Sequence, residues 1–81
     1  RVHCGETPAQ YMLQGILEKL TDFEDIQTRT LLDNYVFKII PMLNPDGVAR
    51  GHWRFDIKGH NLNRKYNSTE FDQYPTILAA K

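Results

Sequence analysis

The chain of 81 residues contains a single cysteine, Cys4, which excludes an internal disulfide and is compatible with a reducing compartment. Long apolar runs are also scarce. The most apolar stretch, residues 36–40, is interrupted by Lys38 and is far too short to cross a bilayer. No repeat, low-complexity segment or signal peptide is visible, and the chain begins with Arg1 instead of Met. We therefore expect a soluble internal piece of a longer protein, with no membrane partner.

The chain also lacks net charge, because ten basic residues balance ten acidic ones. The two signs are nevertheless unevenly distributed. Residues 1–33 carry three basic and six acidic residues, whereas residues 46–65 carry five basic and two acidic ones. Five cations without interleaved aromatic residues give only weak support for nucleic-acid binding. The local excess of positive charge better suits an anionic ligand, so we expect no nucleic-acid partner.

Hydrophobic residues make up 41% of the chain, which is ordinary for a folded protein. Thr7, Pro8 and Gln10 have the spacing of a helix start with a capping box. An apolar stripe at helical spacing follows up to Leu20. A second, shorter helix is predicted over residues 24–33, and another helix begins within residues 70–81.

Residues 35–40 are β-branched and aromatic with little alternation, which is typical of a strand covered on both faces. A strand end at residues 1–2, the first helix and this strand make a βαβ-like unit. We therefore predict an α/β fold, in which the chain is a fragment of a mixed, mainly parallel sheet flanked by helices. The long loop over residues 44–67 that follows is expected to be an active-site loop.

His3 and Glu6 are three residues apart, a spacing that lets an imidazole nitrogen and a carboxylate reach one metal ion. Zinc accepts both ligand types, and its catalytic sites use three protein ligands and a water. Taken alone, the pair is a weak motif. The alternative is a histidine at a strand end, with Glu6 capping the following helix.

Three further groups of polar residues lie in the loop. Residues 44–47 form by default a turn. Arg54 has the chemistry to polarise a scissile carbonyl. Asn63 and Arg64 are adjacent and can both donate to a carboxylate, as an enzyme that cuts at a peptide C-terminus requires. The alternative for this part of the chain is a solvated basic loop.

Taken in order, these motifs resemble the zinc metallocarboxypeptidase family, and more closely its cytosolic carboxypeptidase branch. The resemblance is carried by residues 1–8, 40–48, 50–54 and 59–66, and the last three stretches are most similar to enzymes that remove branch-point glutamates from polyglutamylated tubulin. The chain departs from the branch pattern at Cys4, where proline is usual, and at His60, where a small apolar residue is expected.

The resemblance implies that residues 1–81 are the N-terminal part of a zinc carboxypeptidase catalytic domain. His3 and Glu6 would be two of three Zn²⁺ ligands, Arg54 would assist catalysis, and Asn63 and Arg64 would bind the substrate carboxylate. The third ligand, the general-base glutamate and a substrate-side tyrosine of the family are absent from this chain. A cytoplasmic enzyme acting on glutamate-rich C-termini such as the tubulin tail is therefore expected, and residues 1–81 alone are predicted to be inactive.

Two other functions stay open at this point. A degenerate relative would still bind acidic C-terminal tails through Asn63 and Arg64 without zinc catalysis. An amide hydrolase acting on small acylated amino acids would use the same two residues. The sequence gives no oligomeric state, no side-chain preference and no flanking domain.

Overall fold

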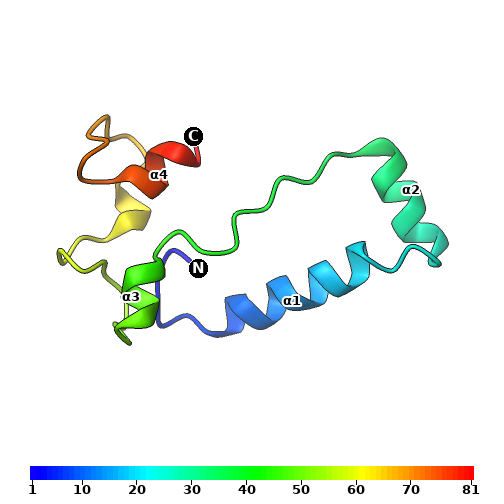
Figure 1. The fold of residues 1–81 in the computed structure, drawn as a ribbon, viewed down its shortest axis with the longest axis horizontal. Helices are drawn as coiled ribbons and strands as arrows, with labels where there is room; N and C mark the ends of the chain where they lie inside the picture. Colours follow the sequence, from blue (N-terminus) through cyan, green and yellow to red (C-terminus); the bar gives the residue numbers. More distant parts are fainter.

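The computed structural model describes residues 1–81, and it is built of helices and long irregular segments. Figure 1 shows two parts of the chain, an arm at one end and a more compact cluster that contains the N-terminus at the other. The arm consists of α1 (Pro8–Leu20) and α2 (Ile26–Asn34), and the cluster contains α3 (Pro45–Ala49), the 3₁₀ helix η1 (Leu62–Arg64) and α4 (Pro75–Ala79). The radius of gyration is 15.4 Å, whereas a compact domain of this length has about 12 Å. The chain is therefore elongated, and none of its helices has the length and apolar character needed to cross a membrane.

The prediction of an α/β fold is wrong for this structure, because no β-strand forms anywhere in the chain. Residues 35–42 are extended, residues 36–40 form no backbone hydrogen bond, and Val36 is 88% exposed. The backbone N of Arg1 donates to Pro41 O at 2.8 Å, and Leu43 N donates to Arg1 O at 2.9 Å. These two bonds have the pattern of one rung between parallel strands. A strand needs such bonds along its whole length, and only residues 1–2 lie beside this segment, so neither the sheet nor the βαβ-like unit forms.

Helix α1 begins at Pro8, as predicted, but its start is not a capping box. Thr7 already has helical dihedral angles, and its side chain caps no backbone N–H. Proline suits the first helical position because that residue needs no N–H bond and its φ is fixed. The predicted apolar stripe lies in the helix but is not covered, since Met12 is 70% exposed and Ile16 is 50% exposed. Burial of this stripe is therefore not observed.

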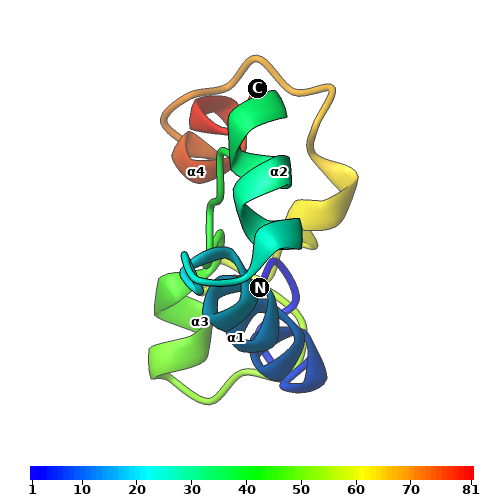
Figure 2. The same ribbon diagram turned by 90° about the vertical axis from the view of Figure 1, so that its right-hand side faces the viewer.

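Helix α2 covers nearly the predicted range and is fixed to the end of α1 by polar contacts. Asp25 accepts a hydrogen bond from Thr28 N at 2.7 Å and pairs with Lys19 Nζ at 2.9 Å. Thr28 is fully buried and donates through Oγ1 to Lys19 O at 2.8 Å. The two helices are seen together in Figure 2, where α2 stands in front of α1. This corner is held by capping and charge and has little apolar burial.

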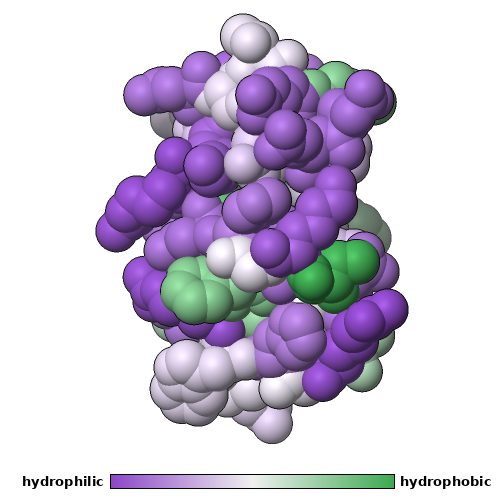
Figure 3. Space-filling view, turned by 90° about the vertical axis from the view of Figure 1, so that its left-hand side faces the viewer, coloured by the Kyte–Doolittle hydropathy of each residue, from purple (hydrophilic) through white to green (hydrophobic).

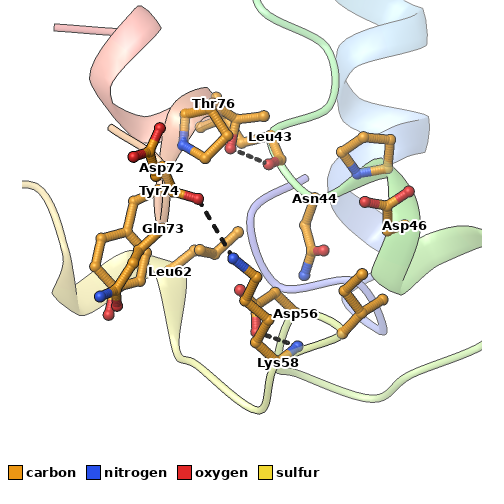
Figure 4. A pocket seen from close by; sticks show the side chains of 13 residues that line it. Leu43, Asn44, Asp46, Asp56, Lys58, Leu62, Asp72, Gln73, Tyr74 and Thr76 are labelled. Carbon is orange, nitrogen blue, oxygen red and sulfur yellow. Dashed lines mark hydrogen bonds between the residues drawn. The ribbon is translucent and has the colours of Figure 1, made fainter. Parts of the chain in front are cut away.

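The apolar core lies in the cluster and is small. Leu62, Tyr74 and Ile77 are buried together, with Val2 and Leu43 packed against them. A cavity of about 140 Å³ lies beside this core, between residues 43–46, 56–58 and 72–76. Figure 4 shows its walls, including the bond from Thr76 Oγ1 to Leu43 O at 2.8 Å and the bond from Lys58 Nζ to Asp72 O at 3.4 Å. This core anchors η1 through Leu62. It thereby also holds Asn61, the residue before η1, which contacts His3.

Candidate metal and carboxylate site

His3 and Glu6 lie together on a turn just before α1. The side chain of His3 is 7% exposed and that of Glu6 is 58% exposed, and His3 Nδ1 lies 3.0 Å from Glu6 Oε1. The turn is closed by a hydrogen bond from Glu6 N to His3 O at 3.3 Å. Glu6 caps α1 only through its backbone oxygen, which accepts from Ala9 N at 3.2 Å. The carboxylate is therefore directed to the imidazole and not to the helix end.

The other face of the His3 ring contacts Asn61. His3 Nε2 lies 3.0 Å from Asn61 Oδ1, and 58 residues separate the two positions in the sequence. A hydrogen bond at the second ring nitrogen fixes the orientation and tautomer of a metal-binding histidine. The resemblance included Asn61 within residues 59–66 but gave it no role of its own. The signal in the sequence was its place two residues before Asn63.

The contacts of His3 define what the ring can bind. Both nitrogens face oxygen atoms, Nδ1 the Glu6 carboxylate and Nε2 the side-chain oxygen of Asn61. When Nε2 donates its N–H to Asn61, Nδ1 is the nitrogen that keeps a free lone pair. A metal ion held here would take Nδ1 and the Glu6 carboxylate as its ligands.

The two donors fit zinc in their chemistry, since imidazole nitrogen and carboxylate oxygen are both preferred zinc ligands. They do not complete a site. Nowhere in the chain do three His, Cys, Asp or Glu side chains come close enough to hold one ion. Cys4 follows His3 directly, but its Sγ–H donates to Phe55 O at 3.4 Å. The chain therefore supplies two candidate ligands, and a catalytic zinc site needs a third.

Arg54 lies beside the same carboxylate, with its Nη1 3.8 Å from Glu6 Oε1. Its position is set by the backbone, because Gly5 N donates to Trp53 O at 2.7 Å. A Cβ atom at Gly5 would lie 2.4 Å from this oxygen, so the close approach requires glycine at this position. The structure thus brings Arg54 to the predicted ligand pair. Trp53 itself is 83% exposed.

Asn44 joins the segments on both sides of the site. It is 2% exposed, and its Nδ2 donates to Val2 O at 3.2 Å and to Phe55 O at 3.3 Å. Its Oδ1 accepts from Gly47 N at 3.1 Å and thereby caps α3. Residues 44–47, predicted as a turn, are therefore the start of a short helix. One buried amide side chain connects the residues before His3 with the residue after Arg54.

Asn63 and Arg64 lie on η1, close in sequence to Asn61. Arg64 is exposed, and the one hydrogen bond of its side chain is from Nη1 to Asn63 O at 3.1 Å. Neither side chain forms a hydrogen bond or an ion pair with His3, Glu6 or Arg54. The guanidinium is therefore available to an anion. Figure 3 shows the end of the molecule formed by the cluster, and hydrophilic side chains predominate over this face.

The remaining histidines lie outside the pair. The turn over residues 56–60 is closed by Asp56, whose Oδ1 accepts from Lys58 N at 2.9 Å and from His60 N at 2.7 Å. The His60 ring packs edge-on against Tyr74 with centroids 5.3 Å apart. His52 donates its backbone N–H to Gly47 O at 2.8 Å. Neither ring belongs to a group of three possible metal ligands.

The residues around His3 thus form a half-site with two donors of zinc type, an arginine beside them and a second arginine on η1. A family model described as zinc carboxypeptidase matches residues 1–77. The chain belongs to the zinc carboxypeptidase family, as the resemblance predicted. All the candidate site residues, from His3 to Arg64, fall within the match.

Individual proteins of the family are similar to the chain over all its 81 residues. The chain is 51% identical to cytosolic carboxypeptidase-like protein 5 of Danio rerio and 48% identical to the Homo sapiens protein of that name. It is 46% identical to cytosolic carboxypeptidase 1 of Homo sapiens. The chain spans 9% of the length of the first two relatives and 6% of the third.

Proposed function

We propose that the protein carrying this chain is a cytoplasmic zinc carboxypeptidase that removes glutamates from a C-terminus or side-chain branch, as on the polyglutamylated tail of tubulin. The observation that carries the proposal is the His3–Glu6 pair, which is 3.0 Å apart and has Arg54 beside it. Membership of the zinc carboxypeptidase family supports the reaction class. The names of the cytosolic carboxypeptidase relatives support the compartment.

In the proposed mechanism His3 Nδ1 and Glu6 would hold the metal, and Asn61 keeps the His3 ring in the orientation that directs Nδ1 to Glu6. Zinc, when bound, would supply an activated water and polarise the scissile carbonyl. Arg54 donates to the carbonyl oxygen as negative charge develops on it. Asn63 and Arg64 bind the free carboxylate of the substrate, and the planar guanidinium suits a two-oxygen partner. The two-ligand half-site is the reason that residues 1–81 alone are expected to be inactive.

The proposed substrate class follows from charge. Residues 46–65 carry a net charge of +3, and Arg64 is exposed without an acidic partner. A cationic surface beside the reaction centre raises the local concentration of an acidic peptide and repels a basic one. A glutamate-rich tail fits this surface, and its C-terminal or branch carboxylate provides the group that Asn63 and Arg64 would bind.

The test uses the purified full-length protein and a peptide that ends in several glutamates. We expect release of free glutamate, measured by mass spectrometry, and no release from the same peptide with an amidated C-terminus. Glu6→Gln should abolish the reaction. Arg64→Gln should lower kcat/KM by about 100-fold, since a charge-assisted bidentate contact is worth about 3 kcal/mol. Arg50→Gln is the matched control, because Arg50 is exposed and forms no ion pair.

Other outcomes separate the alternatives. Tight binding of the free-carboxylate peptide without glutamate release would support a binding module that has no zinc catalysis. Release from small acylated amino acids, with the glutamate peptide left intact, would support an amide hydrolase. Either result would overturn the proposed peptidase, and so would equal cleavage of the amidated peptide.

A further inference from the structure

Glu6 serves two partners through one oxygen atom. Its Oε1 lies 3.0 Å from His3 Nδ1 and 3.8 Å from Arg54 Nη1. The carboxylate is the group that would carry the negative charge to a bound cation. It is also the acidic group that neutralises Arg54, since Arg54 has no other ion-pair partner in the chain. The candidate ligand and the candidate catalytic arginine are therefore already in contact.

The backbone keeps this contact in place. Trp53 O accepts from Gly5 N at 2.7 Å, and Phe55 O accepts from Cys4 Sγ at 3.4 Å. The residues on both sides of Arg54 are thus bonded to the turn that carries Glu6. The backbone of Arg54 is therefore held beside this turn, and only the Arg54 side chain is free to change its partner. Both side chains are accessible enough to do so, at 39% exposed for Arg54 and 58% for Glu6.

From this arrangement we propose that Arg54 competes with the metal for Glu6, so that metal binding and the release of Arg54 toward substrate are coupled. This inference rests on the proposed metal site. Without metal, the guanidinium rests on the Glu6 carboxylate. With a divalent cation on Glu6, the carboxylate is neutralised and the cation repels Arg54, which leaves the guanidinium free for a carbonyl oxygen. Coupling of this kind is reciprocal, and it makes the protein load metal before substrate.

The test measures zinc affinity, with no activity assay. The full-length protein is stripped of metal and titrated with Zn²⁺ in competition with a chromophoric chelator. Arg54→Gln removes the competing charge at similar side-chain size and should bind Zn²⁺ about fivefold more tightly, as expected for unit charges about 4 Å apart on two solvent-exposed side chains in the dielectric of bulk water. Arg54→Lys keeps the charge and should stay within about twofold of the wild type. Arg50→Gln is the control for loss of an exposed cation that forms no ion pair.

Salt provides the second measurement, because screening weakens interactions between exposed charges. The difference between Arg54→Gln and the wild type should shrink in about 1 M NaCl if it is electrostatic. Equal or weaker zinc binding by Arg54→Gln would overturn the inference and leave the proposed metal site standing. Absence of measurable Zn²⁺ binding by the wild type and by both Arg54 variants would overturn the metal site and the inference together. Circular dichroism and the thermal midpoint establish that each variant is folded.

Discussion

The Nε2 atom of His3 and the Oδ1 atom of Asn61 lie 3.0 Å apart, although 58 residues separate them in the sequence. His3 is buried, and the contact leaves its Nδ1 facing Glu6. The pair connects the turn before α1 with the start of η1. The candidate metal ligand His3 is thereby linked to η1, which carries the candidate carboxylate-binding residues Asn63 and Arg64. The same contact therefore helps to position both the metal site and the carboxylate site.

Asn61→Ala should weaken zinc binding by the full-length protein by about 10- to 100-fold, the usual cost of losing the outer partner of a metal-binding histidine. Competition with a chelator measures the affinity. Asn67→Ala is the matched control, because Asn67 is exposed and its side chain forms no hydrogen bond. Unchanged affinity in Asn61→Ala would mean that His3 is oriented without Asn61.

Two glycine variants should shift stability in opposite directions. In Gly5→Ala the new Cβ would lie 2.4 Å from Trp53 O, and the strain should lower the free energy of unfolding by about 1–3 kcal/mol. Gly15 lies in α1, and a Cβ atom added there would have no other atom within 4 Å. Gly15→Ala should therefore raise the free energy of unfolding by about 0.5–1 kcal/mol. Urea denaturation measures both, and a neutral Gly5→Ala would disprove the close approach.

Asn44→Ala should destabilise the cluster by about 1–3 kcal/mol, since it removes a helix cap and leaves the Val2 and Phe55 oxygens without this donor. The unfolding midpoint in urea is the readout. Asn34→Ala serves as the comparison, because Asn34 is exposed and bonds only to Thr30 O within α2. Similar midpoints for the two variants would contradict the connecting role of Asn44.

Stability should fall in acid through Asp25. The hydrogen bond with Lys19 and that from the Thr28 backbone lower the pKa of Asp25 from its ordinary value of 3.8 to about 2. Because the folded-state pKa is the lower one, the ionised carboxylate stabilises the folded state above pH 3.8, and this contribution is lost as the pH falls through about 2. Asp25→Asn keeps a capping oxygen without the charge, so its unfolding free energy should decline less between about pH 5 and pH 2. If the unfolding free energies of the wild type and Asp25→Asn fell in parallel with pH, Asp25 would not be the cause of the acid destabilisation.

Local features of the fold followed from the sequence, but the sheet did not. The start of α1 at Pro8 and the place of α2 were predicted because proline and helical spacing act over a few residues. Residues 35–40 have strand composition and are extended, yet they form no strand. A strand exists only with a partner along its length, and strand composition does not provide one. Most of the apolar stripe of α1 remains exposed for the same reason, since the chain covers little of it.

The sequence by itself determined the family, the spacing of His3 and Glu6, and the positive charge around Arg64. The family follows from the order of the motifs along the chain, and the other two depend on residue identity and on neighbours within a few positions. Only the tertiary structure decided that Asn61 holds His3 and that Arg54 lies on Glu6. These contacts join residues 48 to 58 positions apart. They depend on the path of the backbone, which is fixed by the close passage of Gly5 past Trp53 and by the buried amide of Asn44.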